Sequence, residues 1–317
     1  MKAWWNLVAV VLAALLSVTP AWTAAVPDRL TPSDAELVVQ VNVRQLLQTP
    51  LVKKHALDPL KALLEHSAET RRLLHAAGLD PFHDIDTISV STSGRPLKGG
   101  KLLVVVCGSF SPDKVQTAAD DYAKKHPGRI KTGKEGELSM WEIRGDDGSF
   151  YAAFADNKTL VMTATKDETV AVIRRAGQAP QQPSAAMQAA LAHLKGGENM
   201  WLAMVATDEI KQLLKADDAS KDFAAAMQSV TGALELSDDA QFGLEVHTNS
   251  TEAAAKLKAR LDELMPLLSF LGAGKDRSGQ LAKEVIDSIK LKTEQNDVSI
   301  RLHVTDAQIG KTRKKAP

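Results

Sequence analysis

The chain is short of cysteine, of aromatic residues and of net charge, and each shortage excludes a class of protein. Its 317 residues include one cysteine, Cys107, so an internal disulfide framework and a cysteine-based zinc site are both excluded. With two Tyr and seven Phe, it lacks the exposed aromatic residues, interleaved with basic ones, that bind single-stranded nucleic acid. Lys plus Arg and Asp plus Glu both number 39, so no overall charge attracts nucleic acid.

Long apolar runs are also missing after the first 25 residues, and no later segment approaches the length of a transmembrane helix. Residues 1–25 contain one basic residue, Lys2, and an apolar run from Leu7 to Val18 that is too short to span a bilayer. Small residues follow and offer Thr23-Ala24-Ala25 as a cleavage site, which predicts a secretory signal peptide. We therefore expect a soluble mature protein, secreted or periplasmic, in the cell envelope. Retention of residues 1–25 as an uncleaved anchor is the alternative.

Two similar stretches lie far apart in the chain. Residues 36–47 read ELVVQVNVRQLL and residues 200–214 read MWLAMVATDEIKQLL, and each is a short apolar strand that leads into a helix. In the first stretch Leu37, Val39 and Val41 fall on one face, which predicts a strand with that face buried. The repetition indicates an internal duplication.

The elements expected after each stretch follow a common order: helices, two strands, a helix, and closing strands. A Pro-containing polar stretch, residues 177–184, separates the two copies. In the second copy an Ala-rich helix is expected to run to about Val230. In the first copy the strands are expected at residues 86–92, 101–110, 137–143, 149–155 and 159–165, and in the second at 233–238, 241–249, 288–294 and 298–304.

These patterns predict an α+β fold that is internally duplicated, with antiparallel sheets covered by amphipathic helices. Strands joined by short hairpins favour antiparallel sheets, and helices between groups of strands argue against strict strand–helix alternation. We divide the chain into a signal peptide (1–25), a first α+β repeat (26–180), a second α+β repeat (181–310) and a basic tail (311–317). Whether the two sheets join is left open by the sequence.

Polar residues that could carry chemistry are each explained by local structure. His83, Asp84 and Asp86 form a polar cluster, but neighbouring side chains of an extended segment point to opposite sides, so a turn is the preferred interpretation over a metal site. The strand setting of Cys107 predicts a small buried side chain and not a reactive thiol. The tail residues Lys311, Arg313, Lys314 and Lys315 could contact acidic polymers, although a solvated terminus is favoured.

Three short motifs are near matches to known functional ones. Ser111 and Lys114, with residues 131–133, are similar to motifs of the serine penicillin-binding and β-lactamase enzymes, but the third motif is missing and Ser111 is expected to cap a helix. Residues 94–101 depart from a phosphate-binding loop in spacing and are followed by a strand. Asn157 and Asn249 begin glycosylation sequons at expected turns. We therefore predict no catalytic, cofactor-binding or metal-binding residue, and no cofactor.

Two stretches resemble a group of exported bacterial proteins described only as domains of unknown function. Residues 30–47, LTPSDAELVVQVNVRQLL, and residues 149–173, SFYAAFADNKTLVMTATKDETVAVI, carry the resemblance, which spans most of residues 30–310 as a pattern. It implies an envelope or extracellular location and a duplicated α+β fold, and it offers no catalytic position.

The function expected from these observations is non-enzymatic binding or scaffolding in the bacterial cell envelope. The alternative is a hydrolase-type enzyme whose site is assembled between the two repeats from residues distant in sequence. A third alternative is a subunit that pairs with a second copy through exposed sheet edges. Convergence of Ser, His, Asp or Glu side chains with perturbed pKa values in one pocket would favour the enzyme.

Overall fold

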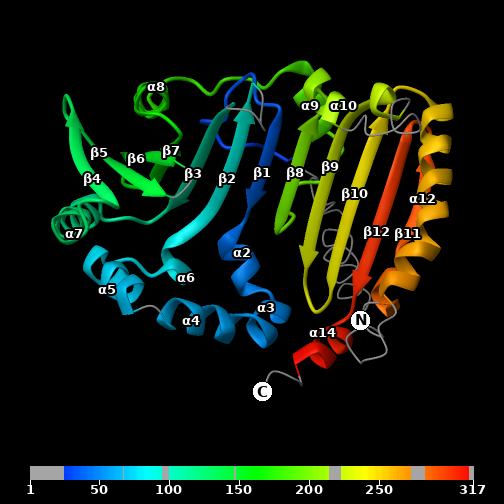
Figure 1. Cartoon of the computed structure of the whole chain (residues 1–317), viewed down its shortest axis with the longest axis horizontal. Helices are drawn as coiled ribbons and strands as arrows, with labels where there is room; N and C mark the ends of the chain where they lie inside the picture. Colours follow the sequence, from blue (N-terminus) through cyan, green and yellow to red (C-terminus); the bar gives the residue numbers. More distant parts are fainter. Residues whose placement is uncertain are drawn as a thin grey trace, which may run out of the picture.

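The computed structural model describes residues 25–66, 68–94, 100–145, 148–213, 223–272 and 283–313. All but the last residue of the predicted signal peptide, and the last four residues of the basic tail, lie outside these residues. The described strands form one 12-stranded sheet in which every pair of neighbours is antiparallel (Figure 1). The structure is therefore mixed α and β, with strands predominating.

In each half the chain starts at the middle of the sheet, crosses to the edge and returns inward. The order across the sheet is β11-β12-β10-β9-β8-β1-β2-β3-β7-β6-β5-β4. The strands before residue 180 are β1 (Leu37–Val41), β2 (Ile85–Ser93), β3 (Lys101–Gly108), β4 (Ile130–Glu135), β5 (Leu138–Gly145), β6 (Gly148–Asp156) and β7 (Thr159–Thr163). Those after it are β8 (Met200–Val205), β9 (Met227–Leu236), β10 (Ala240–Thr248), β11 (Lys290–Glu294) and β12 (Asp297–Val304).

The two similar stretches of the sequence meet at the centre of this sheet. β1 and β8 are antiparallel neighbours, with Leu37 opposite Met204 and Val41 opposite Met200. Each then continues outward, β1 to β2 and β8 to β9, so the strands of the two halves form a single sheet. The question left open by the sequence is thereby answered: the sheets join edge to edge.

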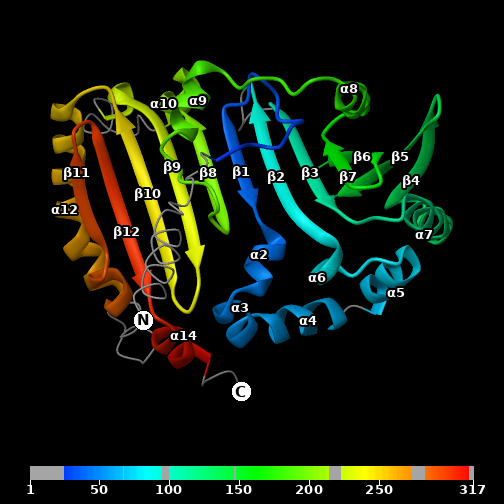
Figure 2. The ribbon, with the colours of Figure 1, turned by 180° about the vertical axis from the view of Figure 1, so that it is seen from behind.

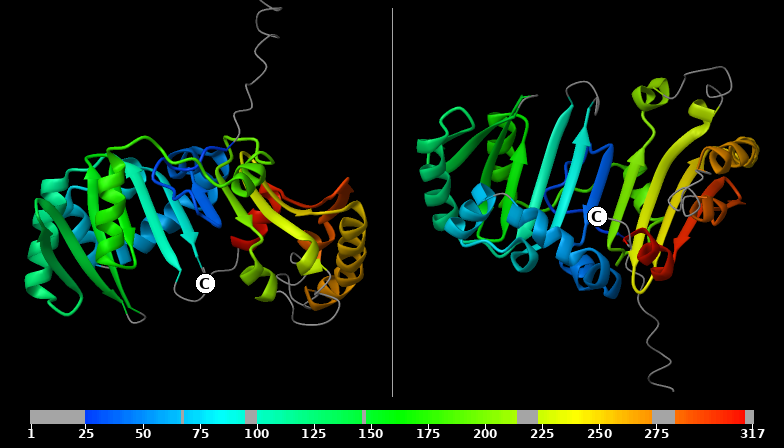
Figure 3. Two further views of the ribbon diagram at one scale, coloured as in Figure 1. Left: turned by 90° about the horizontal axis from the view of Figure 1, so that it is seen from above. Right: turned by 60° about the horizontal axis from the view of Figure 1, so that its bottom comes forward.

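Helices contact both faces of the sheet. One face, called here the α9 face, carries residues 25–35, α8 (Lys166–Ala176) and α9 (Ala185–Leu191) (Figure 2). The opposite face, called the α12 face, carries α7 (Pro112–Lys125) over the strands near β4 and α12 (Thr251–Gly272) over β10 to β12. The view from above shows a curved sheet with these two helices at its ends (Figure 3).

The segment that connects β1 to β2 in the sequence forms a series of short helices along one end of the sheet (Figure 1). Thr49 caps the helix that begins with Pro50, and Asp80 caps the one that begins with Pro81, as expected for Pro in a first helical turn. Gly78, at a φ of 61°, provides the left-handed residue that ends the helix Ala68–Ala77. These helices are α2 (Val43–Gln48), α3 (Pro50–His55), α4 (Leu57–His66), α5 (Ala68–Ala77) and α6 (Pro81–Asp84). Two further helices are α10 (Asp208–Leu213) and α14 (Asp306–Arg313), and α14 lies beside α3.

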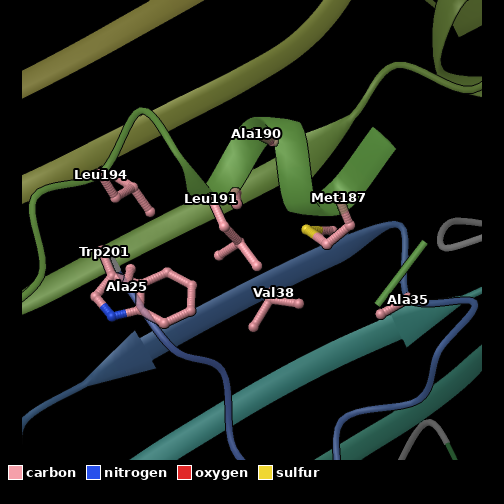
Figure 4. Close-up of a cluster of buried hydrophobic side chains, with 9 residues drawn as sticks. Ala25, Ala35, Val38, Met187, Ala190, Leu191, Leu194 and Trp201 are labelled. Atoms are coloured by element: carbon pink, nitrogen blue, oxygen red, sulfur yellow. The ribbon is translucent and has the colours of Figure 1, made fainter. Parts of the chain in front are cut away.

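The central core lies on the α9 face, where the two halves join. Val38 from β1 and Trp201 from β8 pack beneath Met187 and Leu191 of α9 (Figure 4). Val38 and Met187 are fully buried. Apolar side chains of this size contribute about 1.5–3 kcal/mol each when fully buried, so this cluster fixes α9 and both central strands together.

Most of the predicted strands are confirmed, but three details are wrong. The predicted buried face of the first strand, that of Val39, is only half-buried, because the neighbouring strands and α9 bury Val38 on the other side. The Ala-rich helix was expected to run to Val230, but β9 already begins at Met227. β4 has no predicted counterpart, because its polar sequence IKTGKE lacks an apolar alternation.

Candidate functional site

Two histidines and an aspartate converge at the α9 face of the second half. His247 lies on β10, Asp297 lies opposite it on β12, and His193 follows α9. His247 Nδ1 is 3.0 Å from Asp297 Oδ1, and His193 Nδ1 is 3.9 Å from Asp297 Oδ2. The two imidazole rings stack with their centroids 3.7 Å apart. We call these three residues the His–Asp cluster.

Local structure holds each member in place. The antiparallel pairing of β10 with β12 sets His247 beside Asp297, and the β10–β9 register shifts between His247 and Thr248. After α9 the chain turns through Gly196 and Gly197, both at positive φ, which glycine adopts without steric cost. His193 is thus brought over the sheet at the start of a turn that leads into β8.

The two imidazoles have different environments. His247 is 3% exposed, whereas the His193 side chain is 38% exposed. Burial and the neighbouring His247 lower the pKa of His193, and the charges of Asp297 and Glu245 oppose that shift without cancelling it. His193 is therefore neutral at physiological pH, with a ring nitrogen able to accept a proton or bind a metal ion.

Thr231, His247 and Asp297 form a line of hydrogen bonds like that of a hydrolase triad. Thr231 Oγ1 lies 3.0 Å from His247 Nε2, while Nδ1 of the same ring faces Asp297. However, Thr231 is 2% exposed on β9, and the backbone around it is paired with β8 and β10. Nucleophilic catalysis needs a reachable hydroxyl and free N–H donors, so this line of residues is not arranged for acyl transfer.

A shallow pocket lies beside the cluster on the same face. It encloses about 320 Å³, including open solvent, and His193 and Thr231 are among its lining residues. Arg301 pairs with Glu245 across its floor, and a side chain at Gly243 would press on that guanidinium. The pocket is therefore polar and charged.

Over the middle of the sheet, apolar side chains on the α12 face are less buried than those on the α9 face. The strands β9, β8, β1, β2 and β3 direct large apolar side chains to this face, and nine of these are half-buried, whereas Val38, Trp201 and Val105 on the opposite face are buried. None of the nine belongs to a buried cluster of described residues. We call them the open strip: Val39, Val41, Ile88, Val90, Leu102, Val104, Val106, Leu202 and Leu234.

A basic pocket lies at the end of the sheet next to the open strip. It has an empty volume of about 670 Å³, including open solvent, among α2, α3, α4 and α6. α2 begins two residues after β1 ends, and α6 ends where β2 begins, so the pocket lies at the same end of the sheet as the Val41–Ile88 pair of the strip. Its lining combines basic, polar and apolar side chains: Arg44, Lys53, Lys61, His83, Gln48, Leu47, Leu57 and Phe82.

The basic side chains of this pocket differ in the groups that they contact. Arg44 pairs with Asp86 and His83 Nδ1 lies 2.7 Å from Asp80, whereas Lys61 Nζ lies over the Phe82 ring, 5.9 Å from its centroid. Of the predicted polar cluster, His83 and Asp84 thus lie in the short helix α6 and Asp86 lies at the start of β2, where it pairs with Arg44.

The other candidate residues named from the sequence lie apart from these sites. Ser111 precedes α7 as expected, but its hydroxyl makes no capping bond, so the expectation of a side-chain cap is wrong. Lys114 packs its side chain near Gly78. Asn157 occupies the β6–β7 turn and Asn249 follows β10, as expected. Residues 95–99 and 314–317 lie outside the described residues, so most of the Gly94–Lys101 loop and the end of the basic tail are not placed.

Cys107 is half-buried on β3 beneath residues 25–30. Its Sγ lies 3.5 Å from Asp28 Oδ2, and burial, followed by the charge of Asp28, raises the pKa of the thiol to about 11. The thiolate is the reactive form. The Cys107 side chain therefore stays a protonated thiol at physiological pH.

We expect iodoacetamide at pH 8 to alkylate Cys107 in the folded chain at least roughly 100-fold more slowly than in urea, where a thiol pKa of about 8.5 applies. The rates are measured by mass spectrometry. Asp28→Asn removes the nearest negative charge and should accelerate the folded reaction. Equal rates in the folded and unfolded chains would contradict the sheltered position.

The described residues contain no helix that combines the length and apolar character needed to cross a membrane. No protein-family model, curated protein or solved structure matches the chain.

The His–Asp cluster was missed in the sequence because its members are far apart. His193, His247 and Asp297 lie on three separate segments, and no local spacing connects them. Only the pairing of β10 with β12, together with the path of the turn after α9, brings them into contact.

Proposed function

We propose that this chain is an exported, non-enzymatic binding protein of the bacterial cell envelope whose ligand is a long-chain fatty acid. The observation that carries the proposal is the open strip: nine apolar side chains of a central sheet that are only half-buried, where the opposite face is buried. Contiguous apolar side chains that keep some exposure are typical of binding sites. Export rests on the predicted signal peptide and on the resemblance to exported bacterial proteins.

The basic pocket supports a ligand that is both apolar and anionic. It lies at the same end of the sheet as the Val41–Ile88 pair of the strip, and Lys53 and Lys61 complement a carboxylate. The five residues of β1 span about 17 Å at 3.3 Å per residue, which accommodates most of an extended long acyl chain. The acyl chain would lie on the strip and the carboxylate would lie near Lys53 and Lys61.

The test is calorimetric titration of palmitate into the chain that begins at Val26, below the concentration at which palmitate forms micelles. We expect one site with a dissociation constant on the order of 10 µM. Octanoate should bind at least about 100-fold more weakly, because each buried CH₂ contributes about 0.8 kcal/mol.

Matched variants separate the two parts of the site. Val104→Gln places an amide on the strip and should weaken palmitate binding at least about 10-fold. Leu63→Gln, at a side chain 70% exposed on α4, is the control and should leave binding unchanged. The double variant Lys53→Gln/Lys61→Gln should weaken palmitate but not hexadecanol. Palmitate binding that is unaffected by Val104→Gln would exclude the strip as its site.

The internal duplication is part of the same proposal. β1, β2, β3 and β7 are neighbours in that order, and β8, β9, β10 and β12 repeat the order on the other side of the centre. In both halves a helix, α7 or α12, precedes the strands that return to close the sheet. This common path supports two α+β repeats, at 26–180 and 181–310, and the first half carries β6, β5 and β4 where the second half has the single strand β11.

A hydrolase-type enzyme is the second candidate, favoured by the His–Asp cluster. Its residues converge beside a pocket, and the pKa of His193 is lowered. The cluster lies wholly within the second half, not between the repeats. Pairing of two copies through the sheet edges is disfavoured, because Lys131 and Lys134 on β4, and Lys290 and Lys292 on β11, place charges on both edge strands.

A further inference from the structure

We propose that His193, His247 and Asp297 form a binding site for one divalent transition-metal ion of the zinc class. The proposal is independent of fatty-acid binding, because the cluster lies on the α9 face and the open strip on the opposite one. One donor atom from each residue lies within 4.8 Å of the other two. Two imidazoles and one carboxylate are a common zinc ligand set, and three protein ligands leave one position open.

The donor distances are close to those of a metal site. Zinc binds imidazole nitrogen at about 2.0–2.1 Å and carboxylate oxygen at about 2.0–2.2 Å, which places tetrahedral donors roughly 3.2–3.5 Å apart. The observed separations, 3.0 Å for His247 and 3.9 Å for His193, lie on either side of that range. At 3.9 Å, His193 and Asp297 are too far apart for a direct hydrogen bond, and an ion bound by both would draw them closer.

Thr231 supplies the outer contact that such a site needs. A ligating histidine usually donates its other N–H to an acceptor, which fixes the tautomer. His247 can donate from Nε2 to Thr231 Oγ1 at 3.0 Å, and Nδ1 then presents its lone pair to the ion beside Asp297. The ion takes the place of the Nδ1 proton that faces Asp297 when the site is empty.

His193 provides the adjustment that binding requires. The two rings stack with an angle of 29° between their planes, so their Nδ1 lone pairs run side by side and do not yet converge. His247 is buried and held by two hydrogen bonds, whereas the His193 side chain is 38% exposed. Rotation of the His193 ring therefore completes the site without disturbing the sheet. The open position then faces the pocket lined by Glu245 and Arg301.

Strand β12, which carries Asp297, also carries a second histidine that serves as a matched control for metal binding. His303 Nε2 lies 3.0 Å from Asp239 Oδ2, the same separation as between His247 and Asp297. No second imidazole accompanies that pair in the residues around it that the structure describes. A lone His–Asp pair and the His–Asp cluster can therefore be compared within one protein.

The experiment is titration of Zn²⁺ and of Co²⁺ into untagged protein that has been treated with a chelator. We expect one Zn²⁺ per chain with a micromolar or tighter dissociation constant, and for Co²⁺ the strong visible absorption of a tetrahedral site. His193→Ala, at an exposed side chain that leaves the fold intact, should weaken Zn²⁺ binding at least about 10-fold. His303→Ala should change it less than about 2-fold.

Two results would overturn the proposal. One is the absence of Zn²⁺ binding and of Co²⁺ absorption in protein whose circular dichroism shows it folded. The other is Zn²⁺ binding that His193→Ala leaves unchanged, because the ion would then be bound elsewhere.

Discussion

Replacing Gly108 by alanine is expected to destabilise the protein by roughly 3 kcal/mol or more. Gly108 ends β3, and a Cβ atom there would lie 2.0 Å from the carbonyl oxygen of Asp84, a backbone atom. That oxygen accepts a hydrogen bond from the N–H of Ser109 at 2.7 Å, and Gly108 itself donates to the carbonyl of Lys158. The methyl group must therefore separate α6 from the end of β3, which disrupts backbone contacts as well as packing.

Urea unfolding followed by circular dichroism measures this loss. Gly133→Ala is the matched control, because Gly133 also lies in a strand and no atom lies within 4 Å of a Cβ added there. We expect that control to change the free energy of unfolding by less than about 1 kcal/mol. Equal stabilities for the two variants would show that β3 and α6 are not in contact as described.

Replacing Trp201 by alanine is expected to cost about 3–5 kcal/mol of unfolding free energy, the usual range for an aromatic side chain removed from a core. Trp201 is 2% exposed and packs with Val38 and Leu191 where the two halves join (Figure 4). The loss should affect both halves together, because the same cluster holds β1, β8 and α9. Urea unfolding should therefore shift as a whole to lower denaturant.

Phe242→Ala provides the comparison for this variant. Phe242 is 39% exposed on β10, so its removal should cost about 1 kcal/mol or less. If Trp201→Ala were no more destabilising than Phe242→Ala, the cluster beneath α9 would not be the central core. If only half of the sheet unfolded early, the two halves would be energetically independent.

Elements determined by local pattern could be predicted from the sequence. The β6–β7 hairpin has two apolar strands with a polar turn between them, and α7 has Pro112 at its start. The start of α8 is also set locally, since the Thr165 hydroxyl accepts a hydrogen bond from the N–H of Glu168. In each case the residues that determine the element lie within a few positions of one another.

Features that depend on tertiary contacts could not be predicted. The buried side of β1 is decided by Trp201 and α9, which are distant in sequence, and not by the alternation of β1 itself. Residues 227–230 follow an Ala-rich segment that favours a helix, yet their pairing with β8 and β10 makes them part of a strand. Polar β4 forms because β5 offers it an edge, and an edge strand needs no apolar face.

The candidate sites also depend on tertiary contacts. The lining residues of the basic pocket all lie between 44 and 83, but only the packing of their helices brings the basic side chains together. The His–Asp cluster depends on the β10–β12 register together with a turn that starts from α9. No spacing rule applied to one segment can identify such a site.

The place of β1 in the sheet has a consequence for how the chain matures. Both neighbours of β1 are needed to satisfy its backbone, and one of them, β8, begins only at Met200. A nascent chain that has emerged only through the first half therefore presents a bare, uncharged strand, LVVQV, which is open to pairing with other chains. That edge of β1 stays open until the second half has been synthesised and β8 pairs with it.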